Sequence, residues 1–441
     1  MNAATLAAIL ALAPPTAQPE GGRLTRAQLE EDVGVLEAAL RGKWSYYGMR
    51  AEKNGFDAAA VAAEMLARRP DGATHDEFLH DLRLVVGAMN DGHAHAASPF
   101  VGPPLRRYQH FVVRDCAEGI IVAAVAEDLP GPRPAVGDRL VAIDGEPIDA
   151  RIEREHRTAI GSTPGMRRGA AIAAALRSAA ASSEIELETV GGETRRVTLP
   201  TSPVLPRSLA PPGAMTLRWP RAGVALITVP SFSVSDWGAW LKTPPEERDA
   251  FLAKDKAAID AVFDQALEPG PRAVILDLRG NGGGTDLLGI HAAQRFVQEP
   301  FRYFQLSGFH GGKWTEPFGI LYKPRKPTLE MPLFILIDEE VFSTADNFAR
   351  CLDDLRPDAV FIGRPTGAGT GAPGILASLP HSKAFVSACT QRVYGPKGTL
   401  IEGVGTAPDV PVRWTRRDVI GGRDPDLEAA LERVPAAPPT P

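Results

Sequence analysis

The feature that most constrains the fold is an alternation of short apolar runs with helical segments between residues 213 and 425. Four runs have the length and content of buried strands: GVALITVPSF, RAVILDLRG, PLFILIDEE and DAVFIGRP. Between them lie segments with helical spacing, such as DLLGIHAAQRFV and STADNFARCLDDL. Strands that alternate with helices in this way build largely parallel sheets covered by helices. The sequence therefore predicts a layered α/β core over residues 213–425.

Two regions of different character precede this core. Residues 23–106 carry helical patterns: apolar residues recur at 3.6-residue spacing in TRAQLEEDVGVLEAAL, and THDEFLHDLRLVVGAM opens with a T-x-x-E capping box. Residues 107–205 alternate short β-runs with turn signals such as IDGEP, and the segment around Gly137 and Asp138 resembles a PDZ domain. We therefore expect a multidomain α/β protein with an N-terminal helical cap and a PDZ-like β-rich module. A small β-domain without a ligand would show the same pattern.

The two ends of the chain differ from the rest. Residues 1–22 contain an apolar run, LAAILALA, that is too short to span a bilayer and resembles the core of a signal peptide. This pattern predicts a periplasmic or secreted protein, with a cytoplasmic location as the alternative. Residues 426–441 end in the Pro/Ala-rich segment VPAAPPTP, which predicts a disordered tail.

Composition argues against several classes of partner. The 441 residues include 44% hydrophobic and 23% charged side chains, and the net charge of −6 comes without a basic stripe. Nucleic acid is not an expected partner, because phosphate binding needs clustered Lys and Arg. No run after the N-terminus approaches about eighteen apolar residues, so no stable membrane insertion is expected. The three cysteines, Cys116, Cys351 and Cys389, are far apart and predict neither a zinc site nor a disulfide framework.

A glycine-rich loop follows the second predicted core strand. In VILDLRGNGGGTDLLG, Gly280 and residues 282–284 remove side chains where a strand passes into a helix. The N–H groups of such a loop can approach a phosphate or an oxyanion closely. The loop lacks the last glycine of a dinucleotide motif and has no G-K-[ST], so it favours an oxyanion site. A purely structural turn is the alternative, and no cofactor is expected.

A second strand-to-helix turn carries a serine. Ser343 lies between the strand FILIDEE and the helix that begins in STADNFA. A helix N-terminus would aim N–H groups at this hydroxyl, but a serine at this position is most often only an N-cap. The α/β-hydrolase motif G-x-S-x-G is absent. Ser343 therefore becomes a candidate nucleophile only together with a base and an oxyanion loop in the same domain.

Two histidines in the loop MNDGHAHAAS are candidates for that base. His93 and His95 share a face if the segment is extended, although either would also suit an ordinary packing or surface role. A His-x-His pair can bind a metal, for which His291 and His310 would be further ligands. No H-E-x-x-H spacing supports that interpretation. A metal-dependent amidohydrolase using His93 and His95 is therefore the weaker hypothesis.

Four segments follow one another in the order found in tail-specific, C-terminal-processing serine peptidases: LDLRGNGGG, LIDEEVFSTADNFA, GRPTGAGTG and GTLIEGVGTAPDVPV. The helical start, the DGHAHA loop and the PDZ-like insertion are similar to that family too, so the resemblance covers nearly the whole chain. It implies a ClpP/crotonase-like core, a serine-type peptidase activity and a peptide or unfolded protein as substrate. Homo-oligomers occur in the family, but no interface can be read from the sequence.

The family has two catalytic solutions, and the resemblance favours one of them. The processing peptidases use a Ser–Lys dyad, but Ala368 and Gly369 stand here where that lysine would fall. Arg364 cannot replace it, because a guanidinium stays protonated. The chain is more similar to the tricorn-core-like branch, which uses a serine with a histidine and a glutamate.

The resemblance to that branch implies a role for each matching residue. Ser343 would be the nucleophile, His93 the general base and Glu402 a supporting carboxylate. Gly283 or a neighbouring glycine would hold the oxyanion together with the N–H of Thr344.

Two alternatives remain open at this level. His95 is the fallback base. A non-catalytic member of the same fold that binds a peptide or an apolar ligand in the cleft would have many of the same segments.

Overall fold

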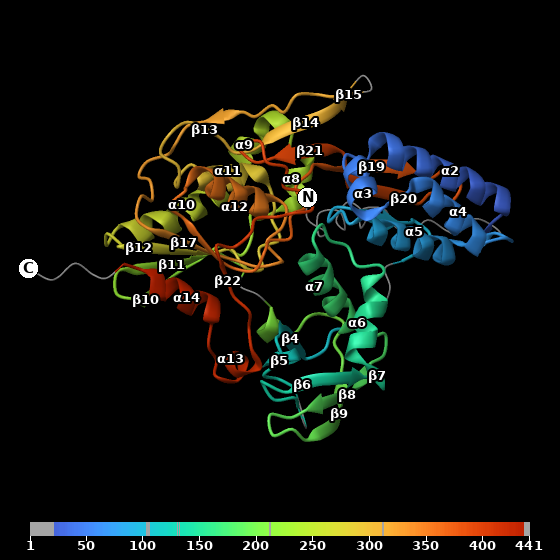
Figure 1. The fold of residues 1–441 in the computed structure, drawn as a ribbon, viewed down its shortest axis with the longest axis horizontal. Helices are drawn as coiled ribbons and strands as arrows, with labels where there is room; N and C mark the ends of the chain where they lie inside the picture. The colour runs from blue at the N-terminus through green and yellow to red at the C-terminus, as the bar shows by residue number, and fades with distance from the viewer. Residues whose placement is uncertain are drawn as a thin grey trace, which may run out of the picture.

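The computed structural model describes residues 22–102, 106–129, 131, 133–210, 213–310 and 313–435. Its architecture is multidomain α/β, as the sequence predicts, with a helix-covered sheet, a β-rich unit and an N-terminal helical unit (Figure 1). In the described part of the chain, no helix is long and apolar enough to cross a membrane. The predicted signal peptide over residues 1–22 lies outside the described residues except for Gly22.

The core is a six-stranded sheet. Across the sheet the strands are β10 (Thr216–Arg221), β11 (Val224–Thr228), β12 (Ala273–Asp277), β17 (Leu333–Ile337), β18 (Val360–Gly363) and β22 (Val410–Pro411). β11 to β22 pair in parallel, and β10 adds an antiparallel edge. All residues of β12 and β17 are buried, which explains why their sequences are continuous apolar runs rather than alternating ones.

Helices cover both faces of this sheet (Figure 1). They are α10 (Ala253–Leu267), α11 (Asp286–Ala293) and α12 (Thr344–Leu355) on one face and α14 (Pro425–Arg433) on the other. Val274 and Leu276 of β12 pack in the first layer, whereas Ala273 and Ile275 pack against the second. Because successive strand residues point to opposite faces, one short run serves both layers.

The C-terminal segment corrects one prediction. A disordered tail was expected over residues 426–441, but α14 occupies most of its described part. Asp424 caps the helix by accepting from Leu427 N, and Ala430 and Val434 are buried against the sheet. The Pro/Ala-rich composition belongs mainly to residues 436–441, which lie outside the described residues.

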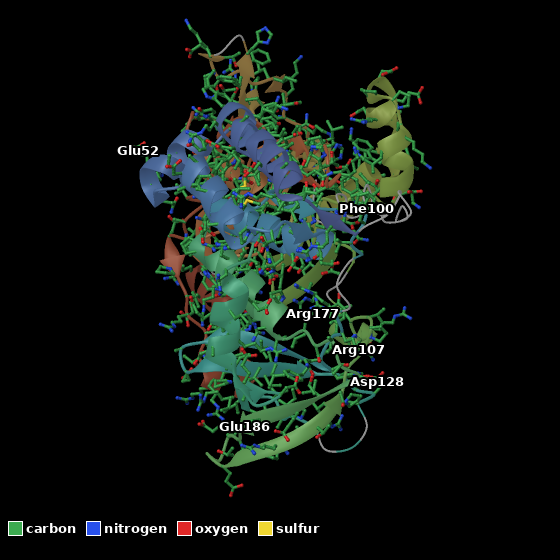
Figure 2. The ribbon with its side chains drawn as sticks, turned by 90° about the vertical axis from the view of Figure 1, so that its right-hand side faces the viewer. Glu52, Phe100, Arg107, Asp128, Arg177 and Glu186 are labelled. Carbon is green, nitrogen blue, oxygen red and sulfur yellow. The ribbon has the colours of Figure 1, made fainter. Side chains whose placement is uncertain are left out.

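The β-rich unit hangs below the core in Figure 1. Its strands are β4 (Phe111–Cys116), β5 (Gly119–Val125), β6 (Arg139–Ile143), β7 (Glu146–Pro147), β8 (Ser182–Glu188) and β9 (Thr194–Pro200), with α6 (Ile148–His156) and α7 (Pro164–Ala175) beside them. All its strand pairs are antiparallel. Figure 2 shows this unit from the side, with Glu186 toward its far end and Phe100 near the helices above it. Its relationship to PDZ domains stays a prediction.

The N-terminal unit is built from two distant parts of the chain. Its helices are α2 (Arg26–Lys43), α3 (Tyr47–Asn54), α4 (Ala58–Arg68) and α5 (His75–Met89). The hairpin of β19 (Pro373–Ser378) and β20 (Phe385–Cys389) completes their apolar core, and β20 pairs with β3 (His95–Ala97). Figure 1 shows this hairpin among the N-terminal helices. Part of the segment predicted as core therefore packs in the N-terminal unit.

The remaining elements are short. They are β1 (Arg23–Leu24), β2 (Ala73–Thr74), β13 (Phe301–Arg302), β14 (Gln305–His310), β15 (Lys313–Trp314), β16 (Leu321–Tyr322), β21 (Gln391–Tyr394), α8 (Trp237–Lys242), α9 (Arg248–Phe251) and α13 (Arg416–Ile420).

Candidate active site

Ser343 occupies a strained turn between β17 and α12. Its backbone has φ 59° and ψ −126°, a region that non-glycine residues rarely adopt and that costs about 1–3 kcal/mol. Its amide donates to Ala368 O over 2.9 Å, which helps to hold this conformation. The side chain makes no capping hydrogen bond to α12. The ordinary N-cap role therefore does not explain this serine.

His93 lies beside that hydroxyl. Its Nε2 is 3.2 Å from Ser343 Oγ, although 250 residues separate the two in sequence. His93 is in a turn after α5 rather than in the extended segment considered from the sequence. Burial lowers the pKa of the imidazole to about 4, against the opposing effect of the Asp91 carboxylate. The ring is therefore neutral over most of the acid range and can accept a proton.

The ring of Phe342 fixes the space around His93. Its centroid lies 4.8 Å from that of the imidazole. A Cβ added at Gly92 would lie 2.4 Å from Phe342 Cε2, and one added at Gly369 would lie 1.6 Å from the same atom. Gly369 thus stands where a dyad lysine was expected from the processing peptidases, and any side chain there would collide with the ring. Among the described hydrogen bonds, Ser343 Oγ is joined to His93 Nε2 and to no lysine.

Two residues that sequence reasoning missed contact the other side of His93. Cys389 Sγ lies 3.5 Å from His93 Nδ1 and 3.3 Å from Asp91 Oδ1. Asp91 also accepts from the backbone N–H groups of His93 and Cys389 and from Trp44 Nε1, at 2.8–3.0 Å. Asp91 lies two residues before His93, in the same MNDGHAHAAS loop. Cys389 gave no signal, because it reaches the site through the β19–β20 hairpin.

The same three residues are a group that could hold a metal ion among those the structure describes. One ligand atom from each of Asp91, His93 and Cys389 lies within 4.8 Å of the others. Each of these side chains is already engaged in hydrogen bonds, and Asp91 accepts four. The ligands considered from the sequence do not assemble here: His291 bonds with Asp260 instead. The structure thus does not pair His93 and His95 as ligands.

His95, the fallback base, makes no hydrogen bond with Ser343 among the described residues. It begins β3 and pairs in register with Ser387 of β20. Burial, followed by the charge of Arg83, lowers its pKa. Among the described hydrogen bonds none joins His95 to Ser343, so the structure does not favour it as the base.

Glu402 is fully buried near the same site but does not contact His93 through any hydrogen bond of the described residues. Its Oε1 lies 2.9 Å from Arg50 Nη2, and its Oε2 accepts from Thr370 N at 3.2 Å. Burial, then the charge of Asp91, raises the pKa of Glu402 to about 8, while Arg50 opposes this shift. Glu402 therefore joins the N-terminal unit to the loop that carries Gly369.

The glycine loop lies directly against Ser343. The N–H of Gly283 donates to Asn281 Oδ1 at 2.9 Å and is therefore already engaged. The neighbouring Gly284 N–H and the Thr344 N–H have no hydrogen-bond partner among the described backbone bonds. Thr344 is the first residue of α12, where no intrahelical acceptor exists. Gly284 and Thr344, which carry these two free donors, line the same pocket as Ser343.

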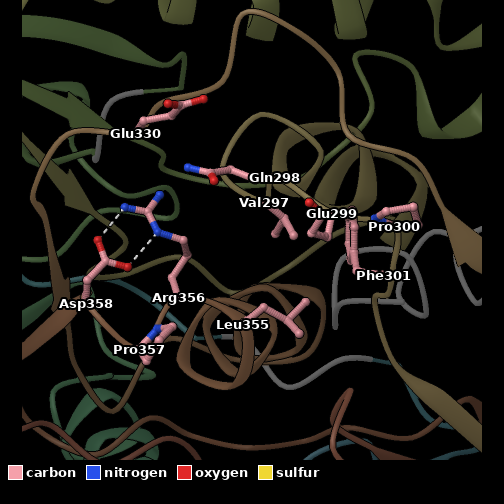
Figure 3. Close-up of a pocket in the computed structure, with 10 residues that line it drawn as sticks. All are labelled: Val297, Gln298, Glu299, Pro300, Phe301, Glu330, Leu355, Arg356, Pro357 and Asp358. Carbon is pink, nitrogen blue, oxygen red and sulfur yellow. Dashed lines mark hydrogen bonds and ion pairs between the residues drawn. The ribbon is translucent and has the colours of Figure 1, made fainter.

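A pocket of about 190 Å³ opens beside these groups. Gly284, Ser343 and Thr344 line it together with parts of β14, the 369–373 segment and β21. A larger hollow of about 420 Å³ lies elsewhere, around Arg356 (Figure 3). There Arg356 is paired with Asp358 at 2.8–2.9 Å, as the dashed lines in Figure 3 show. Of these two pockets, Ser343 lines only the smaller one, together with Gly284 and Thr344.

Known proteins share parts of this sequence and fold. Residues 223–412 match the model of peptidase family S41. A curated protein of Chlamydia pneumoniae is 32% identical over 105 residues, which make up 23% of this chain and 17% of that protein. The chain thus matches about a sixth of the length of this relative.

Solved structures extend the likeness to the whole fold. Mature CPAF superposes with a TM-score of 0.69 at 15% identity, covering 93% of this chain and 96% of that one. A putative peptidase from Parabacteroides merdae superposes with a TM-score of 0.53 at 16% identity, covering 92% and 97%. These two likenesses show a common architecture, and the matched segment contains Ser343, Glu402 and the glycine loop. The match over residues 223–412 and the shared fold support a serine-type peptidase similar to those of family S41.

Proposed function

We propose that the protein is a serine endopeptidase that hydrolyses peptide bonds of peptides or unfolded proteins, with Ser343 as nucleophile and His93 as general base. The observation that carries this proposal is the 3.2 Å contact between His93 Nε2 and Ser343 Oγ beside two free N–H donors. A hydroxyl, a neutral imidazole and an oxyanion site within one pocket are the parts that acyl transfer requires.

The first step forms an acyl-enzyme. Ser343 Oγ bonds to the substrate carbonyl carbon as its proton passes to His93 Nε2, and the carbonyl oxygen becomes an oxyanion. The C–N bond then breaks, and His93 returns the proton to the leaving amine. Water enters in place of the amine and bonds to the acyl carbon as its proton passes to His93. His93 then returns this proton to Ser343 Oγ while the C–O bond breaks and the acid leaves.

The oxyanion is held by backbone N–H groups. Gly284 and Thr344 supply the donors, since Gly283 N–H is engaged with Asn281. Losing one such donor costs about 2.7–4 kcal/mol of transition-state stabilisation in serine peptidases. A Cβ at Gly284 would lie 2.0 Å from Phe232 O, so only glycine lets the loop lie this close to the backbone of Phe232.

Cys389 and Asp91 position the base. The Cys389 thiol donates to Asp91 Oδ1 and accepts from His93 Nδ1–H, which leaves Nε2 free to take the serine proton. The negative charge of Asp91 also stabilises the imidazolium that forms. Glu402 supports the site more remotely, through Arg50 and the Thr370 amide.

Hydrolysis of an unfolded, fluorescently labelled protein such as casein tests the proposal. Ser343→Ala and His93→Ala should each lower turnover by at least about 10³-fold. Ser235→Ala, at an exposed serine outside the site, is the matched control and should retain turnover. Turnover that persists in Ser343→Ala would overturn the assignment.

A covalent probe gives an independent readout. Mature CPAF is known complexed with lactacystin, and the similar fold makes this compound a suitable probe for the present chain. We expect a mass increase on the wild-type protein and none on Ser343→Ala. Tight binding of peptides without turnover or adduct would favour the non-catalytic alternative instead.

A further inference from the structure

The pocket beside Ser343 is lined by both apolar and polar side chains. Phe304, Leu306 and Val393 line its sides. Asp286 and Asn347 line it as well, and Asp286 is the only ionisable residue among its lining groups. A pocket of about 190 Å³ has room for a long side chain rather than a methyl group.

Asp286 has no cation of its own. It is the first residue of α11, and its Oδ1 accepts from Asn347 Nδ2 at 3.0 Å. No ion pair of the described residues includes Asp286, whereas Asp277 and Asp426 both pair with Arg279. Burial raises its pKa, with only the hydrogen bonds of Asn347 and Thr344 opposing that shift among the described groups. The carboxyl group is therefore short of donors.

Asn347 provides a second, independent sign of an unfilled interaction. The residue is 6% exposed, and its Oδ1 has no hydrogen-bond partner in the described part of the chain. A buried acceptor left unpaired costs free energy that native proteins rarely tolerate without a reason. A ligand that brings N–H donors into this pocket would satisfy both the amide oxygen and the carboxylate.

We propose that this pocket selects a lysine or arginine side chain of the substrate residue that supplies the scissile carbonyl. The proposal rests on the proposed peptidase function. The apolar walls would contact the methylene stem, and the charged end would reach Asp286 and Asn347. The same pocket is lined by Gly284 and Thr344, whose N–H groups hold the carbonyl oxygen of that residue, so the side chain enters from the acyl side.

Charge balance explains why such a choice is selective. An apolar side chain of the same length would pack against the apolar lining. It would leave the Asp286 carboxyl group and Asn347 Oδ1 without the donors that a basic side chain brings. Sites built around buried polar groups reject analogues that lack the matching donor far more strongly than apolar sites reject a change in size. A basic side chain also lets Asp286 ionise in contact with a cation, which removes the penalty of burial.

Matched substrates test the proposal. Fluorogenic peptides that differ only before the cut would carry lysine against norleucine, and arginine against citrulline. We expect the kcat/KM ratio of each basic peptide to its neutral partner to be about 100 or more. Asp286→Asn should lower both ratios to about 10 or less. Asp249→Asn, at an exposed carboxylate outside the pocket, is the control and should leave the ratios unchanged.

Mapping of cleavage sites by mass spectrometry removes any dependence on short peptides. Digests of unfolded casein should show lysine or arginine before the cut in wild type and a weaker preference in Asp286→Asn. Lactacystin labelling of Ser343 in each variant separates the two proposals. Labelled enzyme that cuts with equal efficiency before basic and neutral residues overturns the pocket assignment and leaves the peptidase function intact. Wild-type enzyme that neither labels nor cuts overturns both.

Discussion

The Sγ atom of Cys389 lies 3.5 Å from Nδ1 of His93, although 296 residues separate them in the sequence. The same sulfur donates to Asp91 Oδ1, so a thiol stands where serine peptidases usually place a carboxylate directly on the histidine. This arrangement still fixes the tautomer that the reaction needs. It also places the Cys389 thiol between the Asp91 carboxylate and the imidazole of His93.

Substitution of Cys389 should separate positioning from packing. In Cys389→Ala the Nδ1–H of His93 loses its acceptor, and we expect kcat to fall about 10- to 100-fold, less than the loss of about 10⁴ when serine peptidases lose a directly bonded carboxylate. Cys389→Ser keeps both a donor and an acceptor and should restore a large part of kcat. KM should change little in either variant. Equal kcat values for the alanine and serine variants would contradict the role of the thiol.

The pH profile should extend unusually far into acid. Burial lowers the pKa of His93 to about 4, and the neutral ring is the base in the proposed mechanism. Activity is therefore retained as pH falls through 6.5, the ordinary value for histidine, and is lost only near pH 4. The acid limb of kcat/KM for a neutral substrate measures this. A midpoint at 6.5 or above would mean that the ring is more exposed or more strongly stabilised as a cation than its contacts indicate.

Glu402 should tolerate glutamine better than alanine. Because the pKa of Glu402 is raised to about 8, the neutral amide of Glu402→Gln resembles the protonated carboxyl below that pH. We expect its turnover at pH 6–7 to stay within about tenfold of wild type. Glu402→Ala removes the acceptor of Arg50 Nη2 and of the Thr370 N–H and should lower the free energy of unfolding by about 1–3 kcal/mol. Denaturant unfolding of both variants checks this, and a larger loss of turnover in the glutamine variant would show that the charge itself is needed.

Gly369 should not accept a side chain. In Gly369→Ala the new Cβ would lie 1.6 Å from Phe342 Cε2 and push that ring against His93. We expect a large loss of turnover together with a lower melting temperature. Gly398→Ala is the matched control, because Gly398 also has a positive φ but nothing lies within 4 Å of its added Cβ. If both variants keep wild-type turnover, the ring does not set the position of the base.

The sequence predicts the core well because the relevant signals are local. Continuous apolar runs identify β12 and β17, and the turn at Ser343 follows from a strand that passes directly into a helix. The pairing of His93 with Ser343 came from a resemblance to a family rather than from spacing, since no local pattern links residues 250 positions apart.

Other parts of the site depend on tertiary contacts that no local pattern reveals. Cys389 reaches His93 only because β20 pairs with β3 and completes the core of the N-terminal helices. Within the glycine loop, the side chain of Asn281 engages Gly283 N–H and so leaves Gly284 as the free donor that lines the pocket. Helix α14 was missed because a proline-rich end outweighed a short amphipathic segment with its own Asp424 cap.

The most direct test of the account is to locate the covalent adduct of a fluorophosphonate probe. Labelling followed by peptide mapping should place the adduct on Ser343 of the wild-type protein, with no labelling of Ser343→Ala and much slower labelling of His93→Ala. An adduct on another residue, or unchanged labelling of Ser343→Ala, would contradict the proposal that the Ser343–His93 pair performs the chemistry.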